Sequence, residues 1–118
     1  MFKTHFSRSR PYVSDPSITP CVAAEKGADL QSYPSAHSTM AYAMGVVLAH
    51  LLPSQAPAIL ERARLYTENR IRCGAHHRSD TVAGQVLGTV VAVQLLQNPV
   101  FAKQVQAARA ELNAAGLF

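Results

Sequence analysis

Apolar residues recur at helical spacing along the chain after residue 34, in segments bounded by proline and glycine. These segments are residues 35–52, 55–72, 80–97 and a last one running from Asn98 to Gly116. In the first segment the apolar face consists of Met40, Met44, Val47, Leu48 and Leu51, which we expect to lie in the core. No stretch alternates with the period of two that marks strands. The pattern predicts an all-α helical bundle of about four helices.

The segment 80–97 is apolar on most of its sides, so we expect it to lie near the centre of the bundle. Gly84 and Gly88 are four residues apart and fall on one face of this helix. Because glycine has no side chain, this face would allow a second helix to approach closely.

Residues 1–34 differ from the rest of the chain. Prolines at 11, 16, 20 and 34 interrupt them, with serine, threonine and aspartate in between, which predicts an irregular loop. A loop of this length in a small domain is usually functional or disordered. No signal peptide is visible, because the first twenty residues are polar, basic and rich in proline.

The composition is that of one folded domain: 118 residues, 48% hydrophobic and 15% charged. The net charge is +4, and five of the eight arginines lie between residues 62 and 78. This balance suits an anionic partner. The aromatic residues do not alternate with the basic ones, so we expect no nucleic-acid partner. The longest apolar runs, 39–52 and 81–96, are shorter than a membrane span needs, so we expect none.

The stretch from Arg70 to Asp80, RIRCGAHHRSD, carries the most chemistry. The guanidinium of Arg70 suits phosphate oxygens, and a histidine such as His76 can attack phosphorus. A carboxylate such as Asp80 can fix the tautomer and orientation of that histidine. For this stretch alone, plainer interpretations have the advantage: Arg70 as a helix-end charge, His76 as a surface imidazole and Asp80 as a helix cap.

A second candidate lies at the predicted start of the helix 35–52. The free N–H groups of a helix N-terminus bind anions, and Ser35 and His37 stand there. His37 can also donate a proton to a leaving oxygen. A capping or surface role for His37 is, from the local sequence, equally well supported. By themselves, Lys3 and Arg10 belong to a basic, frayed N-terminal tail.

Three motifs occur in order along the chain, and together they are far more specific than any one of them. They are Lys3-x6-Arg10-Pro11, Pro34-Ser35-Ala36-His37-Ser38 and Arg70-x5-His76-x3-Asp80. Their order and spacing resemble the signature of the type 2 phosphatidic acid phosphatase (PAP2) superfamily, which includes bacterial class A non-specific acid phosphatases and vanadium haloperoxidases. The segments RSRPYV, SYPSAHS and NPVFAKQVQAARAEL are closest to the class A acid phosphatases. The resemblance covers nearly all of residues 1–118 and implies a PAP2-type helical domain.

This resemblance implies a metal-independent acid phosphatase that hydrolyses phosphate monoesters through a phosphohistidine. His76 would attack phosphorus, Asp80 would orient His76, and His37 would protonate the leaving alcohol. The phosphate oxygens would be bound by Lys3, Arg10, Ser35, Ala36 and Arg70, together with the backbone N–H groups of Ala36 and His37. The resemblance implies no cofactor and no metal, and vanadate is expected as an inhibitor.

Other functions remain open. A vanadium haloperoxidase would use the same pocket to hold vanadate as a cofactor. A non-catalytic, truncated domain that only binds phosphate is an alternative of another kind. A metal hydrolase built on His76, His77 and Asp80 is less well supported, because no spaced third ligand stands out. A membrane lipid-phosphate phosphatase is disfavoured by the short apolar runs.

The chain departs from the class A pattern in two of its motifs and before the first motif. In the third motif, Asn69 stands where serine is usual just before the arginine. Alanine stands at position 36, where those enzymes usually have glycine, and serine stands at 38 in place of threonine. Relatives also carry further helices before the lysine that corresponds to Lys3. We therefore expect this chain to lack the N-terminal helices of the full domain, to expose an apolar patch, and to need the missing half or a homo-oligomer to cover it.

The family resemblance further implies a periplasmic or secreted protein. In such an oxidising compartment, Cys21 and Cys73 could form a disulfide that ties the N-terminal loop to the catalytic turn. Taken without the resemblance, two cysteines allow either one disulfide or two free thiols.

Overall fold

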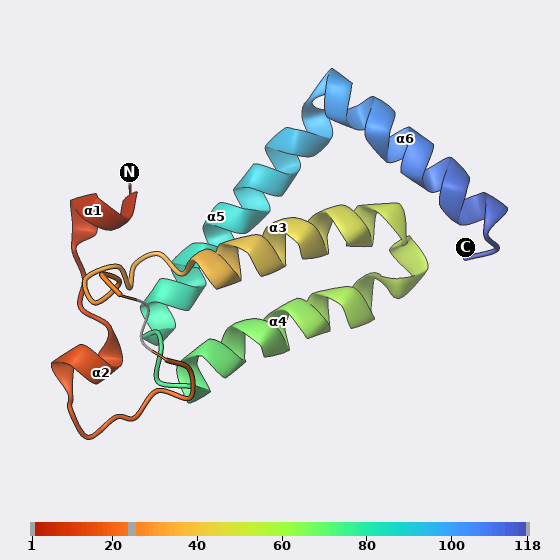
Figure 1. Cartoon of the computed structure of the whole chain (residues 1–118). Helices are drawn as coiled ribbons and strands as arrows, with labels where there is room; N and C mark the ends of the chain where they lie inside the picture. Colours follow the sequence, from red (N-terminus) through yellow and green to blue (C-terminus); the bar gives the residue numbers. More distant parts are fainter. Residues whose placement is uncertain (1, 24–25, 118) are drawn as a thin grey trace.

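The computed structural model describes residues 2–23 and 26–117, and within these ranges it contains helices and loops but no strand (Figure 1). Four long helices follow one another: α3 (Ala36–Leu51), α4 (Ala56–Arg72), α5 (Arg78–Gln97) and α6 (Pro99–Ala114). They match the four segments predicted from the apolar pattern to within a few residues at each end. The predicted all-α class is confirmed.

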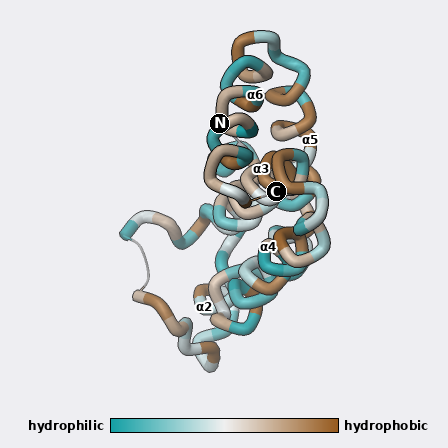
Figure 2. Tube along the Cα trace, turned by 90° about the vertical axis from the view of Figure 1, so that its right-hand side faces the viewer, coloured by the Kyte–Doolittle hydropathy of each residue, from teal (hydrophilic) through white to brown (hydrophobic). Residues whose placement is uncertain are grey.

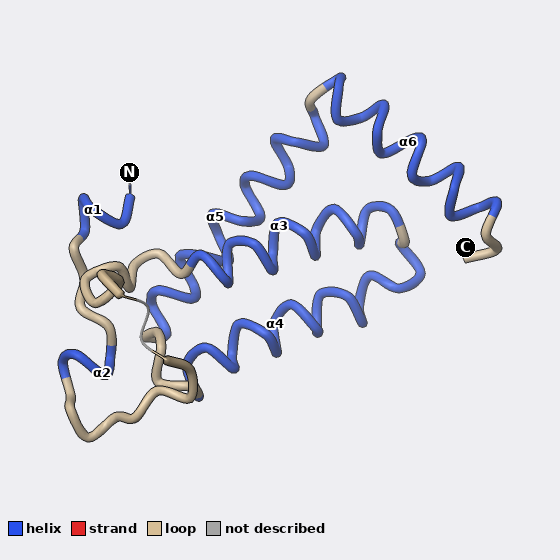
Figure 3. The backbone as a smooth tube through the Cα atoms, in the orientation of Figure 1, coloured by secondary structure: helices blue, strands red, loops and turns tan. Residues whose placement is uncertain are grey.

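The N-terminal part is less irregular than the prolines suggested. It contains two short helices, α1 (Phe2–Phe6) and α2 (Pro11–Ser14), joined to α3 by loops (Figure 3). Pro11 is the first residue of α2, a position where its missing N–H costs nothing. The prediction of a wholly irregular segment over 1–34 is therefore wrong at these two helices. A short 3₁₀ turn, η1 (Pro53–Gln55), connects α3 to α4.

The helix ends follow from local sequence. The side chain of Ser35 accepts a hydrogen bond from the N–H of Ser38, 3.3 Å away, and thereby caps α3. Asn98 caps α6 in the same way through the N–H groups of Val100 and Phe101. Gly74 adopts φ +69° immediately after α4, where residues with a side chain are rarely found.

Helix α3 is the central element: α4 packs along it, and α5 crosses it near its N-terminal end (Figure 1). At that crossing, a Cβ atom on Gly84 would lie 2.6 Å from the carbonyl oxygen of Ser35, and one on Gly88 would collide with the backbone of Thr39. The close approach of a second helix at these glycines is confirmed.

Two predictions about the core are wrong. Met40, Met44 and Leu48 were expected inside, but they are 62%, 57% and 42% exposed. Helix α5 is buried only on the face that packs against α3, and its other face exposes Val82, Val86, Val90 and Val93. Apolar positions recur along all four long helices (Figure 2), but too few elements pack against them to cover every apolar face. The expected exposed apolar surface is confirmed.

Helix α5 also bears on the expectation of no membrane span. Among the described residues it is the one helix long and apolar enough to cross a membrane, judged by length and composition alone. Core helices of soluble proteins meet the same test, so the absence of a membrane span stays a prediction.

Candidate active site

The N-terminal ends of α3 and α5 and the C-terminal end of α4 meet at one end of the molecule, where the N-terminal segment also lies (Figure 1). Between α4 and α5, the N–H groups of Ala75 and His76 both donate to the carbonyl of Arg70, at 3.1 and 3.3 Å. This tight turn places the His76 side chain inside the protein, with 2% of the residue exposed.

Arg10 contacts the His76 ring. Its Nη1 lies 3.1 Å from His76 Nε2 and 2.9 Å from the carbonyl oxygen of Ala75, while its Nε donates to the carbonyl of Ala28 at 3.0 Å. Because a guanidinium only donates, Nε2 of the neutral imidazole accepts from Arg10. In that tautomer the ring proton is on Nδ1, which lies 3.5 Å from Asp80 Oδ2 but makes no hydrogen bond to any described residue.

The carboxylate of Asp80 is fully buried and surrounded by donors. Its Oδ1 accepts from Arg8 Nη1 at 2.8 Å, and its Oδ2 accepts from the hydroxyl of Ser32 at 2.6 Å and from the N–H of His77 at 2.8 Å. Sequence reasoning missed Arg8 and Ser32. In the sequence they are marked only by standing close to motif residues: Arg8 lies two residues before Arg10, and Ser32 lies three residues before Ser35.

These surroundings shift the pKa values of both groups. Burial acts to raise the pKa of Asp80, but the facing His76, the Ser32 hydroxyl, the His77 N–H and the Arg8 charge outweigh it and hold the pKa well below its usual range. The pKa of His76 is lowered, chiefly by burial and further by the charges of Arg10 and Lys3, against an opposing effect of Asp80. The site therefore favours an ionised Asp80 beside a neutral His76.

A small cavity of about 210 Å³ reaches Arg10, which contacts His76, and Ala75, which precedes it, whereas His76 and Asp80 themselves are not among its lining residues. It is lined by Arg10, His37 and Arg70, with Tyr12, Val22, Ala23 and Ala75. The Nε atom of Arg70 is buried and finds no hydrogen-bond partner among the described residues. An anion in this cavity would supply acceptors to two guanidinium groups next to the imidazole of His76.

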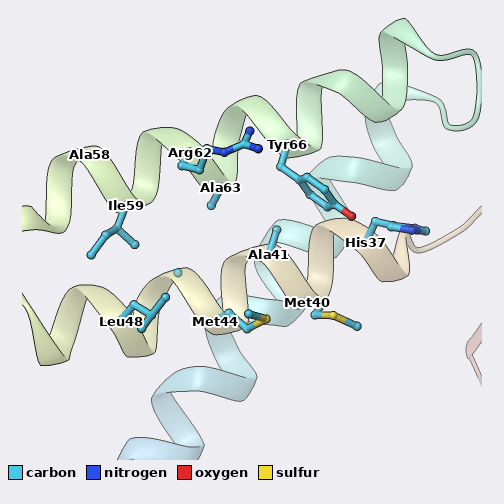
Figure 4. A pocket seen from close by; sticks show the side chains of 11 residues that line it. His37, Met40, Ala41, Met44, Leu48, Ala58, Ile59, Arg62, Ala63 and Tyr66 are labelled. Atoms are coloured by element: carbon cyan, nitrogen blue, oxygen red, sulfur yellow. The ribbon is translucent and has the colours of Figure 1, made fainter. Parts of the chain in front are cut away.

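His37 stands at the mouth of the cavity. It is exposed at the second position of α3, and its ring lies 6.2 Å from that of Tyr66 on α4 (Figure 4). Its pKa is lowered, first by partial burial and then by the charges of Arg70, His76, Arg10 and Lys3. The same histidine lines an apolar groove of about 570 Å³ between α3 and α4, formed largely by Met40, Met44, Leu48, Ile59 and Tyr66 (Figure 4).

The remaining predicted ligands lie close by, with differing geometry. Lys3 donates to the carbonyl of Gln31 at 2.7 Å, and its charge acts on both His37 and His76. Ala36 is exposed in the first turn of α3, where helical N–H groups have no partner within the helix. Ser35 is fully buried, and its hydroxyl accepts from Ser38, so in this structure its side chain serves as a helix cap.

Cys21 and Cys73 form a disulfide, with their Cα atoms 5.0 Å apart. The N–H of Cys21 also donates to the carbonyl of Cys73 at 3.1 Å. The bond therefore fastens the N-terminal loop to the turn that precedes His76. Within residues 2–23 and 26–117, no group of three or more His, Cys, Asp or Glu side chains could hold a metal ion, so the metal-hydrolase alternative finds no ligand set there.

Comparison with known proteins gives the family. The chain is 33% identical to an acid phosphatase of Zymomonas mobilis over 96% of its length and 32% identical to a non-specific acid phosphatase of Salmonella typhi over 94%. A non-specific acid phosphatase of Providencia stuartii is 35% identical over 68% of the chain. The matches cover 43%, 45% and 32% of these relatives, so the chain spans less than half of their length. The PAP2 superfamily pattern matches residues 1–104, and the chain therefore belongs to the PAP2 superfamily.

Proposed function

We propose that this chain carries the catalytic centre of an acid phosphatase, which hydrolyses phosphate monoesters through a covalent phosphohistidine at His76. The observation that carries the proposal is the position of His76, whose Nε2 lies 3.1 Å from Arg10 while its Nδ1 faces the buried Asp80. A neutral imidazole with its proton on Nδ1 has its lone pair on Nε2. Arg10 donates to that lone pair here, so attack requires Arg10 to pass this hydrogen bond to the incoming phosphate.

The first step is attack of His76 Nε2 on phosphorus. A P–N bond forms and the bond from phosphorus to the ester oxygen breaks. Protonated His37 donates its proton to that oxygen, so that the alcohol leaves neutral. Asp80 stabilises the positive charge that develops on the His76 ring, because their facing atoms lie 3.5 Å apart.

The second step returns the enzyme to its starting state. Water attacks phosphorus, the P–N bond breaks, and the proton lost by the water passes to His37. Arg10 and Arg70 neutralise the non-reacting phosphate oxygens in both steps, with Lys3 and the first-turn N–H groups of α3 as further donors. This chemistry consists of positioning and charge neutralisation, which the described residues supply themselves.

The names of the relatives support the phosphatase over the haloperoxidase, since the three relatives compared above carry the name of acid phosphatase. The proposed substrates are small phosphate monoesters. Vanadate, which adopts the geometry of the transferring phosphoryl group, is expected to inhibit. The proposed compartment is the periplasm or the exterior, where a disulfide such as Cys21–Cys73 persists.

The test is hydrolysis of an aryl phosphate between about pH 4 and 8 in the presence of a chelator. Turnover should survive the chelator and fall on the order of 10³-fold or more in His76→Ala. His50→Ala, which changes an exposed histidine near the far end of α3, is the matched control and should leave turnover unchanged. Equal turnover in His76→Ala and the wild type would exclude the proposed mechanism.

A further inference from the structure

The two oxygens of the Asp80 carboxylate have different partners from different parts of the chain. Arg8 Nη1 donates to Oδ1 at 2.8 Å and, at 2.5 Å, to the hydroxyl of Ser79. The hydroxyl of Ser32, a residue with no exposed surface, donates to Oδ2 at 2.6 Å. Neither Arg8 nor Ser32 is one of the motif residues to which the proposed mechanism gives a role.

These contacts determine how the carboxylate faces the imidazole. Oδ2 is the oxygen opposite Nδ1 of His76, and it is held by Ser32 and by the backbone N–H of His77. A rotation of the carboxylate would move Oδ1 away from Arg8 and Oδ2 away from Ser32 at once. Losing either partner leaves the buried carboxylate with one donor fewer, which is unfavourable.

We infer that Arg8 and Ser32 are positioning residues, which fix the Asp80 carboxylate in the orientation that holds His76 as its Nδ1–H tautomer. The inference rests on the proposed function in one respect: it takes His76 to be the nucleophile. Both residues contact the Asp80 carboxylate, and the proposed mechanism gives neither of them a contact with phosphate.

The charge of Arg8 has a second consequence. It offsets the negative charge of Asp80, which would otherwise bind the His76 proton more strongly. The groups that act on His76 include Asp80, Arg10, Lys3 and His37, and the His77 ring lies 3.3 Å from Asp80 Oδ2. Replacing Arg8 with a neutral side chain leaves Asp80 with one neighbouring cation fewer, so the imidazolium form of His76 gains stability.

The test uses the whole chain with Arg8→Met, Arg8→Lys and Ser32→Ala, and with Arg64→Met as control. Arg64 pairs with Glu61 on the exposed surface of α4. The first readout, which needs no turnover, is the ¹⁵N spectrum of the His76 ring, assigned by its absence in His76→Gln. The wild type should show the Nδ1–H tautomer. Arg8→Met should raise the His76 pKa by about 0.5–1 unit, and Ser32→Ala should mix the tautomers.

The second readout is kinetic. Arg8→Met should lower kcat about 10–100-fold with KM nearly unchanged and shift the acid limb of the pH profile upward, and Arg8→Lys should recover part of the loss. If Arg8→Met does not fold, the ¹⁵N spectra of Arg8→Lys and Ser32→Ala test the inference in its place. An unchanged His76 tautomer and pKa in folded variants would overturn the inference. Altered spectra in a chain without any turnover would uphold it and refute the proposed function instead.

Discussion

The imidazole of His76 lies between a cation and an anion, with Arg10 at Nε2 and Asp80 at Nδ1. Arg10 is itself fixed, because its guanidinium also donates to the carbonyls of Ala28 and Ala75. These backbone partners hold the guanidinium near His76 while its hydrogen bond to Nε2 passes to the substrate.

The rate should follow a bell-shaped pH profile centred in the acid range. His76 must be neutral to attack, so kcat/KM rises as pH rises through its pKa. His37 must be protonated to donate, so kcat/KM falls as pH rises through the pKa of His37. Burial and neighbouring cations lower both pKa values from the ordinary 6.5 or so. The basic limb of kcat/KM should thus lie below about pH 6.5. A basic limb well above that value would contradict these assignments.

Substituting His37→Asn should affect substrates unequally. An alcohol leaving group needs the proton from His37, and its loss should slow hydrolysis of an alkyl phosphate about 100-fold or more. A phenol with a low pKa leaves without a proton, so hydrolysis of its phosphate should slow far less. The comparison is of kcat/KM for the two substrates in the variant and the wild type. Equal losses on both would show that His37 is not the acid.

Much of this site could be predicted from the sequence, because motif spacing reflects chemistry. Arg10, His37 and Arg70 line one cavity, Arg10 contacts His76, and Asp80 faces His76, while the roles of these residues stay predictions. Arg8 and Ser32 could not be predicted, since their contacts with Asp80 span 72 and 48 residues and depend on how the N-terminal loops fold. The capping role of the Ser35 hydroxyl likewise appears only in the geometry.

At the scale of elements, the crossing of α3 and α5 holds the two halves of the site in register. Gly84 and Gly88 let the helices approach until the N–H of Ser35 donates to the backbone carbonyl of Asp80 at 3.0 Å. The first turn of α3, which carries His37, is thereby fixed against the first turn of α5, which carries Asp80. Changes at the crossing should therefore alter both stability and the site.

Gly84→Ala should destabilise the fold by about 1–3 kcal/mol, because the new methyl group would meet the Ser35 carbonyl at 2.6 Å. The measurement is urea-induced unfolding followed by circular dichroism. Gln85→Ala, at the next and exposed position of α5, is the control and should change stability by less than about 0.5 kcal/mol. A Gly84→Ala variant as stable as this control would show that the helices do not cross so closely.

The helices themselves were predictable because caps, prolines and apolar periodicity are local signals. The packing partners of each apolar face were not. Met40, Met44 and Leu48 form a regular stripe, but periodicity does not say what lies opposite it, and here they border an open groove. Likewise α1 and α2 are too short to leave a periodic pattern in the sequence.

At the scale of the whole molecule, the helices are too few to bury all of one another's apolar faces. The chain measures 52 × 26 × 21 Å along its principal axes, and apolar faces of α3 and α5 remain at its surface. Either a further polypeptide segment or a second copy could cover them. The Cys21–Cys73 disulfide links the N-terminal segment to the end of α4. The two cysteines are 52 residues apart in the sequence.

Removing this disulfide should be costly. By loop-closure entropy, a bond across this separation stabilises the folded state by about 4 kcal/mol. The double variant Cys21→Ser, Cys73→Ser should unfold at a correspondingly lower urea concentration and lose activity, because the released loop carries Arg10 away from His76. Unfolding of the wild type with and without a reductant gives an independent measurement. Unchanged stability in both experiments would show that the bond does not restrain the folded protein.

The central claim is that His76 becomes phosphorylated. Mixing the enzyme with a labelled phosphate monoester and quenching within milliseconds should trap a phosphoryl group that is stable in alkali and labile in acid, as phosphoramidates are. Peptide mapping should place it on His76, and His76→Ala should carry none, while His37→Asn should accumulate it from an aryl phosphate because water attack then lacks its base. Turnover without any phosphoenzyme, or a label on another residue, would contradict the account.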